Sequence, residues 1–409
     1  MTWTKASSGA YMPYPQRKVE NAALGPLTGL TFTAKDMFDV KGYPTSAGSP
    51  TLLAMSGEKP ESAAAVEMLL AAGARFDGKT VTDELAFSLI GSNAHFGIPV
   101  NGAAPDRFAG GSSSGAASAV SCGLCDIGLA TDSGGSVRGP ASQSGLFGIR
   151  PTYGRISLRG CTPLCPRFDT AGFMTKTLDV FRRTANVFFK TEEERVMPSD
   201  AGTDPKPQAL LVPEDILEAF GSESREALND AFNVAADLFG ESASVRASPY
   251  SLKETLAAYQ RLQGKGIWST WGDFIETQRP CFGPGVKERF AFAHSMAEVD
   301  LAHEETMIEA VRDHIERLLC GGAILMLPTL AGPGPKRDAD AQMLAMFRTS
   351  ASLSFAIGGL AGVPWLTLPV GTIEGAPIGL SLVGAAGTDR RLVELGAKLY
   401  GAVGDRAAG

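Results

Sequence analysis

Short apolar runs alternate with longer amphipathic segments along both ends of the chain, a pattern typical of an α/β protein. Apolar or alternating runs bounded by turn residues predict strands at 30–33, 75–81, 127–131, 323–327, 365–370 and 378–383. Helical periodicity predicts helices at 61–72, 113–121, 341–357 and 389–400. We therefore expect an α/β protein whose sheet carries helices on both faces.

A different pattern fills the segment between about 195 and 320. Charged and polar residues increase there, and long helical periods replace Gly-rich turns at 223–239, 252–271 and 297–319. A chain of 409 residues exceeds the length at which one compact core usually stops growing. We expect a single domain, 1–409, whose core comprises 28–194 and 321–409 and whose helical cap is inserted at about 195–320.

Composition and charge narrow the function classes. The chain is 44% hydrophobic and 20% charged, which is ordinary for a globular enzyme. A formal net charge of −7 without a basic block argues against nucleic-acid and membrane partners. The N-terminus has no apolar signal region and no run of about 18 apolar residues occurs, so we expect a cytoplasmic protein.

Six cysteines in a chain of this length do not indicate a disulfide framework. Cys122 and Cys125 form a CxxC pair, and Cys161 and Cys165 follow, so a metal or redox site has to be weighed. The CxxC pair lies between an Ala-rich helix and an apolar strand, where small buried cysteines pack well. Packing is the favoured interpretation, and we expect no metal and no cofactor.

The first Gly-rich run, 110–115, reads Gly-Gly-Ser-Ser-Ser-Gly. It lacks the Gly-Lys-Ser/Thr ending of a phosphate-binding loop, and it is neither GxGxxG nor preceded by a strand, as a dinucleotide site requires. A flexible linker is another interpretation, but an Ala-rich helix and a buried strand follow directly. Glycines that let the backbone pack closely explain the run better.

The second run, 132–138, follows the predicted strand at 127–131, where open α/β sheets bind ligands. Gly134 and Gly135 allow a tight turn before Ser136, and a nest of N–H groups in such a turn stabilises an oxyanion. Ser136 is therefore a candidate nucleophile. A plain Gly-rich turn whose serine caps the next segment is the other interpretation. The run is not Gly-x-Ser-x-Gly, so no Ser-His-Asp triad is implied.

A serine nucleophile needs a base. Three histidines, His294, His303 and His314, fall in the polar helices predicted for the cap, and His95 lies in a loop. Lys35 ends a predicted strand. A lysine acts as a base only if its surroundings lower its pKa toward neutrality, and by itself Lys35 is more readily interpreted as a surface lysine.

Together these segments resemble the amidase signature family. The family motifs GGSSSG and D-x-GGS-[IV]-R-x-P-A correspond to 110–115 and 132–141, and its strand-ending Lys-Asp corresponds to Lys35 and Asp36. Further family segments match 147–155, 168–172, 359–364 and 377–380. The resemblance covers about 28–190 and 320–400, and it implies the family fold, a mixed central β-sheet flanked by helices on both faces.

The resemblance also implies a Ser–Ser–Lys relay. Ser136 would attack the amide carbonyl and form an acyl-enzyme, Ser112 would pass the proton, and Lys35 would be the terminal base. The peptide between Gly111 and Ser112 would be cis. The oxyanion hole would consist of the backbone N–H groups of Ser133, Gly134, Gly135 and Ser136.

Three neighbouring residues are expected to support this site. Asp132 and Arg138 would brace the loop by an ion pair rather than contact the substrate. Ser113 lies where a serine satisfies free N–H groups at the start of a helix.

The chain looks most like the short family members typified by indole-3-acetamide hydrolase, through 82–88 and 93–97. This implies hydrolysis of a small aryl- or alkyl-acetamide to a carboxylic acid and ammonia. The alternatives are a catalytically silent binding protein and a glutamine amidotransferase-type subunit. We expect a small-molecule amide as the ligand and leave open whether the chain forms a homodimer.

Overall fold

The computed structural model describes residues 2–189 and 206–408, so the predicted boundary between core and cap at 194 lies outside the described residues. Within the described part, ten strands form one sheet in the order β2-β1-β3-β5-β4-β9-β10-β8-β6-β7. Parallel pairs at both ends and antiparallel pairs in the middle confirm the predicted mixed sheet. The strands are β1 (Thr31–Lys35), β2 (Arg75–Thr80), β3 (Ile127–Asp132), β4 (Phe147–Arg150), β5 (Thr170–Thr175), β6 (Leu210–Pro213), β7 (Ser242–Val245), β8 (Ile324–Pro328), β9 (Trp365–Ile373) and β10 (Ala376–Val383).

Large apolar side chains cover one face of the sheet. The helices on this face are α3 (Ala64–Ala71), α6 (Leu178–Phe188), α9 (Asn229–Phe239) and α14 (Asp389–Ala408). In α6 the apolar residues recur every three to four positions, which buries Phe181 and Phe188 and leaves Arg182 exposed. Phe181 and Phe188 contact Phe173 of β5, with ring centroids 5.2 and 5.5 Å apart.

Small residues allow two helices to pack closely on the other face. These helices are α4 (Ser114–Ser121) and α5 (Arg138–Gln143). Every residue of α4 is buried, and a Cβ added at Gly128 of β3 would lie 3.0 Å from the Ala116 carbonyl oxygen. This close fit fixes the loop that precedes α4 against the sheet. α5 begins at the end of the second Gly-rich run, 132–138, and was not among the helices predicted from the sequence.

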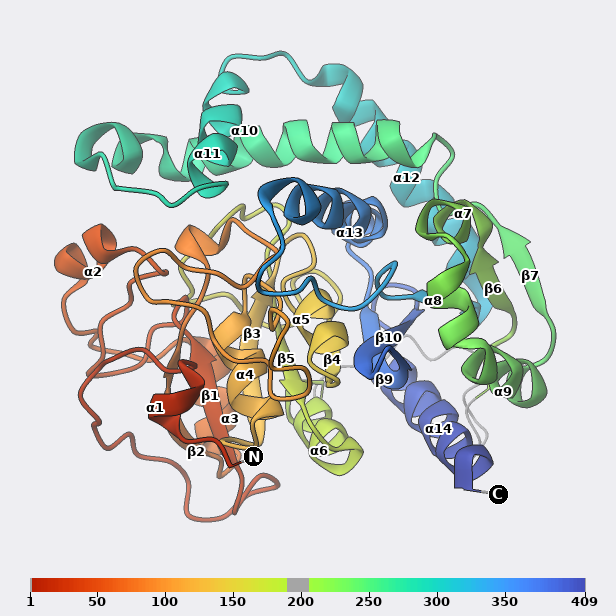
Figure 1. The fold of residues 1–409 in the computed structure, drawn as a ribbon, viewed down its shortest axis with the longest axis horizontal. Helices are drawn as coiled ribbons and strands as arrows, with labels where there is room; N and C mark the ends of the chain where they lie inside the picture. Colours follow the sequence, from red (N-terminus) through yellow and green to blue (C-terminus); the bar gives the residue numbers. More distant parts are fainter. Residues whose placement is uncertain (1, 190–205, 409) are drawn as a thin grey trace.

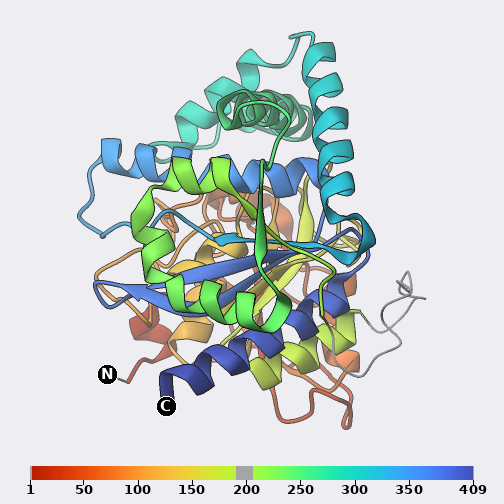
Figure 2. The same ribbon diagram turned by 90° about the vertical axis from the view of Figure 1, so that its right-hand side faces the viewer.

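A layer of long helices lies next to α13 (Ala341–Ala361), on the side of that helix away from the strands (Figure 1). It consists of α10 (Leu252–Gln278), α11 (Val286–Ser295) and α12 (Ala302–Leu319), which pack on one another and on α13. Figure 2 shows α13 and this layer on one side of the sheet, with α6 and α14 on the other. α10 starts at a capping box, in which Ser251 and Glu254 bond to each other's backbone N–H groups.

The helical cap is smaller than the predicted 195–320. Residues 210–245 contribute β6 and β7 to the sheet, so the helical cap begins only at α10. β6 and β7 have four residues each, and the small, largely exposed residues of β7 give no periodic signal. The remaining short elements are α1 (Lys5–Ser8), α2 (Pro50–Ser56), α7 (Glu214–Phe220), α8 (Ser222–Ala227) and 3-10 turns at Glu84–Ala86 and Cys320–Gly322.

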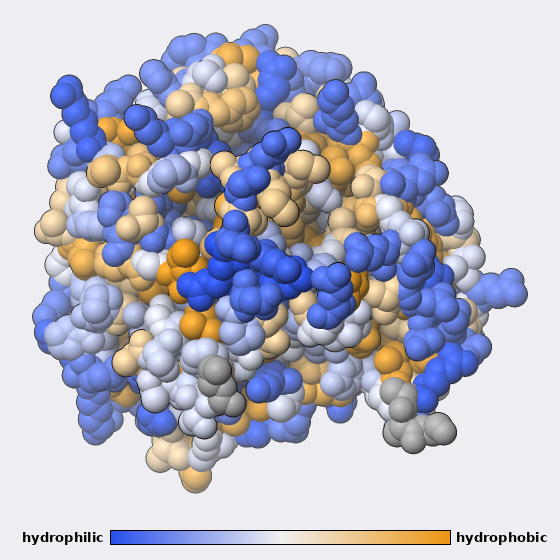
Figure 3. Space-filling model, in the orientation of Figure 1, coloured by the Kyte–Doolittle hydropathy of each residue, from blue (hydrophilic) through white to orange (hydrophobic). Residues whose placement is uncertain are grey.

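α13 has the length and mean hydropathy of a membrane-spanning helix, but 44% of its most apolar window is buried inside the protein. Its buried residues lie in its C-terminal half, where Phe355 and Gly359 contact the loop after β3. The C-terminal half of α13 therefore packs as part of the protein core. On the face drawn in Figure 3, hydrophobic residues occur in small groups between hydrophilic ones.

Candidate active site

The sheet itself brings Lys35 and Thr131 together. β1 and β3 are neighbouring parallel strands, with Ala34 opposite Leu129. Lys35 is the last residue of β1 and Thr131 the penultimate residue of β3, so both side chains lie at the edge where open α/β sheets bind ligands. The sequence analysis missed Thr131. A hydroxyl residue at the end of a strand next to the lysine strand was the signal that could have found it.

Hydroxyl groups enclose the Lys35 amine. The side chain is fully buried, and Nζ lies 2.8 Å from Ser112 Oγ and 2.7 Å from Thr131 Oγ1. Burial lowers the pKa of Lys35 from its usual 10.5 to about 8, although nearby acidic groups, Asp83 first, oppose this shift. A lysine with such a pKa can accept a proton near neutral pH. The interpretation of Lys35 as a surface lysine is therefore wrong.

Ser112 lies in the loop that enters α4, on a tightly held backbone. The Gly111–Ser112 peptide is cis, as the resemblance implied. The Ser112 carbonyl oxygen accepts hydrogen bonds from the Asp83 N–H group (3.1 Å) and the Thr82 hydroxyl (2.9 Å). A Cβ on Gly111 would lie only 2.3 Å from Asp83 Oδ2. The glycine run therefore serves close packing, and the linker interpretation is excluded.

Asp132 anchors the loop that carries Ser136. Its carboxylate accepts a hydrogen bond from the Gly135 N–H group (2.8 Å) and pairs with Arg138 (2.8 Å) and Arg150 (3.2 Å). Burial by itself would raise the pKa of Asp132, but the two guanidinium groups hold it well below its usual range. The predicted pair of Asp132 and Arg138 is thus present, and Arg150 is a second cation that the sequence analysis did not identify.

This anchoring corrects the predicted oxyanion hole. The Gly135 N–H group already donates to Asp132, because an aspartate at the start of a turn accepts bonds from N–H groups further along it. Gly135 is therefore removed from the set of donors that the resemblance implied. The N–H groups of Ser133, Gly134 and Ser136 remain the candidates.

Two helices pack so closely against the loop that carries Ser136 that its glycine positions have no room for a side chain. A Cβ on Gly134 would lie 2.8 Å from the Tyr259 hydroxyl of α10, and one on Gly135 would lie 2.1 Å from Cδ2 of Phe355 on α13. Gly135 also has a φ of +119°, which favours glycine. Ser136 follows directly and is 5% exposed. The loop is thus held between the sheet, the cap and α13.

A cavity of about 200 Å³ opens beside this loop. Its polar side is formed by Thr131, Ser133 and Asp169, and the Ser133 hydroxyl donates to the Asp169 carboxylate. The Ser133 carbonyl oxygen accepts a hydrogen bond from the Tyr259 hydroxyl (2.9 Å). The other residues of the cavity wall are mainly apolar: Met37, Leu158, Cys161, Thr162, Pro163, Leu164 and Pro166. The sequence analysis did not identify the roles of Asp169 and Tyr259.

Ser113 has a different role from the one predicted. It is the N-cap residue of α4, but its side chain makes no capping hydrogen bond. Its hydroxyl donates instead to the Thr131 carbonyl oxygen (3.3 Å), because the start of α4 is buried against β3. The expected capping role of Ser113 is therefore wrong, and the residue ties the loop of Ser112 to the strand of Thr131.

Three of the four histidines make contacts away from Lys35, Ser112 and Ser136. His95 Nε2 lies 2.8 Å from the Cys281 carbonyl oxygen, His314 Nε2 lies 2.8 Å from that of Arg246, and the His294 ring stacks on Trp268. Within residues 2–189 and 206–408, no group of three His, Cys, Asp or Glu side chains could hold a metal ion.

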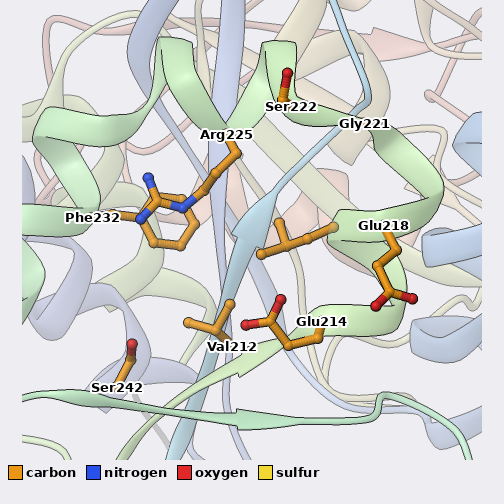
Figure 4. A pocket seen from close by; sticks show the side chains of 9 residues that line it. Val212, Glu214, Glu218, Gly221, Ser222, Arg225, Phe232 and Ser242 are labelled. Carbon is orange, nitrogen blue, oxygen red and sulfur yellow. The ribbon is translucent and has the colours of Figure 1, made fainter.

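A larger cavity, of about 440 Å³, lies at the opposite end of the sheet (Figure 4). It is formed by β6, β7 and α7–α9, and its wall includes Glu214, Glu218 and an Arg225 guanidinium group 3.9 Å from the centroid of the Phe232 ring. The site residues predicted from the sequence do not line it. The smaller cavity beside Ser133 is therefore the candidate substrate site.

Comparisons with known proteins agree with this geometry. The model of the amidase family matches residues 3–393. The chain belongs to the amidase family. Amidase 1 of Oryza sativa subsp. japonica is 32% identical over 412 residues, which cover 93% of this chain and 92% of that protein.

Two further relatives of this amidase-family chain extend the comparison. A solved structure described as "Crystal structure of amidase" has a TM-score of 0.79 and 32% identity, over 93% of this chain and 85% of that chain. One subunit of the glutamyl-tRNA(Gln) amidotransferase of Methanospirillum hungatei is 29% identical over 90% of this chain and 92% of that protein. The expected family and fold are confirmed, and the protein is a hydrolase acting on amide C–N bonds.

Proposed function

We propose that the protein hydrolyses a small carboxamide to a carboxylic acid and ammonia through an acyl-enzyme on Ser136. The observation that carries this proposal is the 2.8 Å contact between Lys35 Nζ and Ser112 Oγ in a fully buried site. A serine hydroxyl is a weak nucleophile without a base, and a buried lysine with a lowered pKa supplies one.

The proposed reaction moves one proton along three side chains. As Ser136 Oγ bonds to the amide carbon, its proton passes to Ser112, and the Ser112 proton passes to Lys35. A neutral Lys35 can accept this proton while it donates a hydrogen bond to Thr131, 2.7 Å away. Backbone N–H groups of the loop between β3 and α5 stabilise the negative oxygen.

The second half of the reaction uses the same residues in reverse. The proton on Lys35 returns through Ser112 to the amide nitrogen, which leaves as ammonia when the C–N bond breaks. Water then attacks the acyl-enzyme and loses its proton along the same relay. The carboxylic acid is released, and the proton returns to Ser136.

The cavity beside Ser133 supports an apolar acyl group. Its volume of about 200 Å³ exceeds the roughly 150 Å³ of an apolar protein cavity that binds benzene. Most of its wall is apolar, with Leu158, Cys161 and Leu164 among its residues. These features favour an aryl- or alkyl-acetamide over glutamine, which carries two charged groups.

Ammonia release by the purified chain tests this proposal. The panel contains phenylacetamide, isobutyramide, acetamide and glutamine. We expect the first two to be hydrolysed with a higher kcat/KM than acetamide, and glutamine to be the poorest substrate. Silence across the panel, with ammonia release from glutamine only after a partner protein is added, would instead support an amidotransferase subunit.

A variant that fills the cavity makes the test specific. Cys161→Phe should lower kcat/KM for phenylacetamide by at least about ten-fold, because a misfit of even one methylene in an apolar pocket costs about 1–3 kcal/mol and the added ring is larger. Acetamide, which does not need the cavity, serves as the matched control and should change little. Equal losses for both substrates would contradict the assignment of this cavity to the acyl group.

A further inference from the structure

Asp83 lies against the peptide that carries Ser112, although nothing in the relay described above uses it. Its N–H group donates to the Ser112 carbonyl oxygen (3.1 Å), and its Oδ2 accepts a hydrogen bond from the Gly91 N–H group (3.0 Å). A Cβ on Gly111 would lie 2.3 Å from the same Oδ2. The fully buried carboxylate is therefore in direct contact with the backbone of the relay loop.

One oxygen of this carboxylate is unsatisfied. Oδ1 of Asp83 is buried and has no hydrogen-bond partner within the described residues. A buried carboxylate in this state is costly unless a positive charge lies nearby. Burial raises the pKa of Asp83, and this shift is opposed first by hydrogen bonds from the Gly91 N–H group and the Ser88 side chain and then by the charges of Lys35 and Arg289. Arg289 keeps its positive charge while its Nε donates to the Phe87 carbonyl oxygen (2.6 Å), so Lys35 and Arg289 both compensate the charge of Asp83.

The acidic groups around Lys35 differ in how far their charge is already compensated. Asp83, Cys161, Asp132 and Asp169 all raise the pKa of Lys35, and Asp83 raises it most. Asp132 forms ion pairs with two arginines. Asp169 accepts a hydrogen bond from Ser133 and two from backbone N–H groups, and burial raises the pKa of the Cys161 thiol to well above neutrality. Of these three carboxylates, Asp83 is the one with a buried oxygen that lacks a hydrogen-bond partner in the described part of the chain, and it also raises the pKa of Lys35 most.

We propose that Asp83 is the counter-charge of Lys35 and sets the pH range in which Lys35 can accept the proton of Ser112. This inference rests on the proposed function and adds a positioning residue, because Asp83 acts through Lys35 and not on the substrate. A negative charge at Asp83 stabilises the ammonium form of Lys35. It therefore makes Lys35 a stronger base and confines its neutral form to higher pH.

The pH dependence of Ser136 labelling by phenylmethylsulfonyl fluoride tests this inference without any amide substrate. In this reaction Ser136 Oγ bonds to sulfur, fluoride leaves, and the Ser136 proton passes through Ser112 to Lys35, which must be neutral. Peptide mass spectrometry gives the labelling rate at each pH. In Asp83→Asn the midpoint of the rate profile should fall by about one pH unit relative to wild type, because an opposing charge is removed.

Matched variants separate the shift of the labelling midpoint from the general effect of removing a buried carboxylate. Asp389→Asn removes another buried carboxylate, which binds the Thr152 backbone and hydroxyl and lies on α14, and it should leave the midpoint unchanged. Asp83→Ser, which is smaller and can still accept the Gly91 hydrogen bond, replaces Asp83→Asn if the latter does not fold.

The possible outcomes distinguish a failure of the role of Asp83 from a failure of the proposed function of Ser136. An unchanged midpoint in a folded Asp83 variant, with wild type labelled at Ser136, would overturn the role of Asp83 alone. A wild-type chain that is not labelled at Ser136 at any pH would overturn the proposed function and this inference with it.

Discussion

Burial of the Lys35 amine lowers its pKa, as its role as a base requires, but it also lowers the free energy of unfolding. The amine is fully buried between Ser112 and Thr131, and burial lowers its pKa to about 8. In the unfolded chain the same group keeps a pKa near 10.5. Between these two values the unfolded state binds a proton that the folded state does not, so stability rises with pH there.

Activity should depend on the neutral form of Lys35. We expect kcat/KM for a hydrolysed amide to rise with pH and to reach half of its plateau near pH 8. At pH 6 it should lie about 100-fold below the plateau, since each pH unit below the pKa removes a factor of ten. A profile measured between pH 5.5 and 9.5 checks this. A flat profile in this range would rule out Lys35 as the base that titrates.

Replacing Lys35 should change activity and stability in opposite directions. Lys35→Met removes a charge that is costly to bury, so this variant should lose activity yet gain stability relative to wild type at pH 7. The gain should shrink by about 2 kcal/mol when the pH is raised from 7 to 10, because wild-type stability rises with pH while the folded lysine is neutral and the unfolded lysine still binds a proton. Urea unfolding of both proteins at the two pH values measures this difference. A difference that does not change with pH would contradict the lowered pKa of Lys35.

At the scale of elements, the loop between β3 and α5 depends on helices that are distant in sequence. The Tyr259 hydroxyl of α10 donates to the Ser133 carbonyl oxygen and accepts a hydrogen bond from Gln263 (2.7 Å). Tyr259→Phe should cost about 1 kcal/mol of stability and should also lower kcat, because the Ser133 end of the loop loses its support.

A second buried tyrosine provides the control. The Tyr43 hydroxyl also makes two hydrogen bonds, both with the Arg17 backbone in the N-terminal segment (2.7 and 3.0 Å). Tyr43→Phe should lower stability by a similar amount and leave kcat unchanged. Thermal unfolding and steady-state kinetics on both variants make the comparison. Equal effects on kcat would show that Tyr259 has no specific role in the site.

The sequence predicted the elements that have strong local patterns. The strand ending at Lys35 and the helix after Ser112 appear within a few residues of their predicted ends, because apolar runs and an Ala-rich segment mark them clearly. β6 and β7 were missed because four residues give no periodicity, and their pairing with β8 is a long-range contact. α5 was missed because its sequence, Arg-Gly-Pro-Ala-Ser-Gln, contains two poor helix formers.

The site shows the same division between local and long-range information. The family motif identified Lys35 and Ser112, and the structure shows their side chains in contact. The residues around Lys35 in the sequence do not by themselves indicate that its side chain is buried. Thr131, Arg150 and Tyr259 could not be assigned, because their roles depend on which strands and helices become neighbours. The Gly135 N–H group was misassigned because the sequence does not show that Asp132 accepts its hydrogen bond.

At the scale of the whole molecule, one of the places where cap and core are joined lies near residue 281. The buried Glu84 carboxylate accepts hydrogen bonds from the Gly283 N–H group (3.2 and 3.0 Å), and His95 contacts the Cys281 carbonyl oxygen. Glu84→Ala should speed hydrogen exchange at the Gly283 amide by about ten-fold, since one charge-assisted hydrogen bond is worth roughly 1.5–3 kcal/mol.

An exposed glutamate provides the control for this prediction. Glu58 pairs with Arg17 at the surface, so Glu58→Ala should leave exchange in 280–285 unchanged. Hydrogen exchange followed by mass spectrometry measures both variants. Unchanged exchange at Gly283 in Glu84→Ala would mean that other contacts fasten the cap to the core.

The central claim for the molecule is that Ser136 is the nucleophile of amide hydrolysis. The most direct test is the rate of ammonia release by Ser136→Ala, compared with wild type, on an amide that wild type hydrolyses. We predict a loss of at least about a thousand-fold in kcat, with the circular dichroism spectrum and the unfolding midpoint retained. A folded Ser136→Ala variant that releases ammonia within ten-fold of the wild-type rate, on the order of 1.4 kcal/mol in activation free energy, would contradict the account.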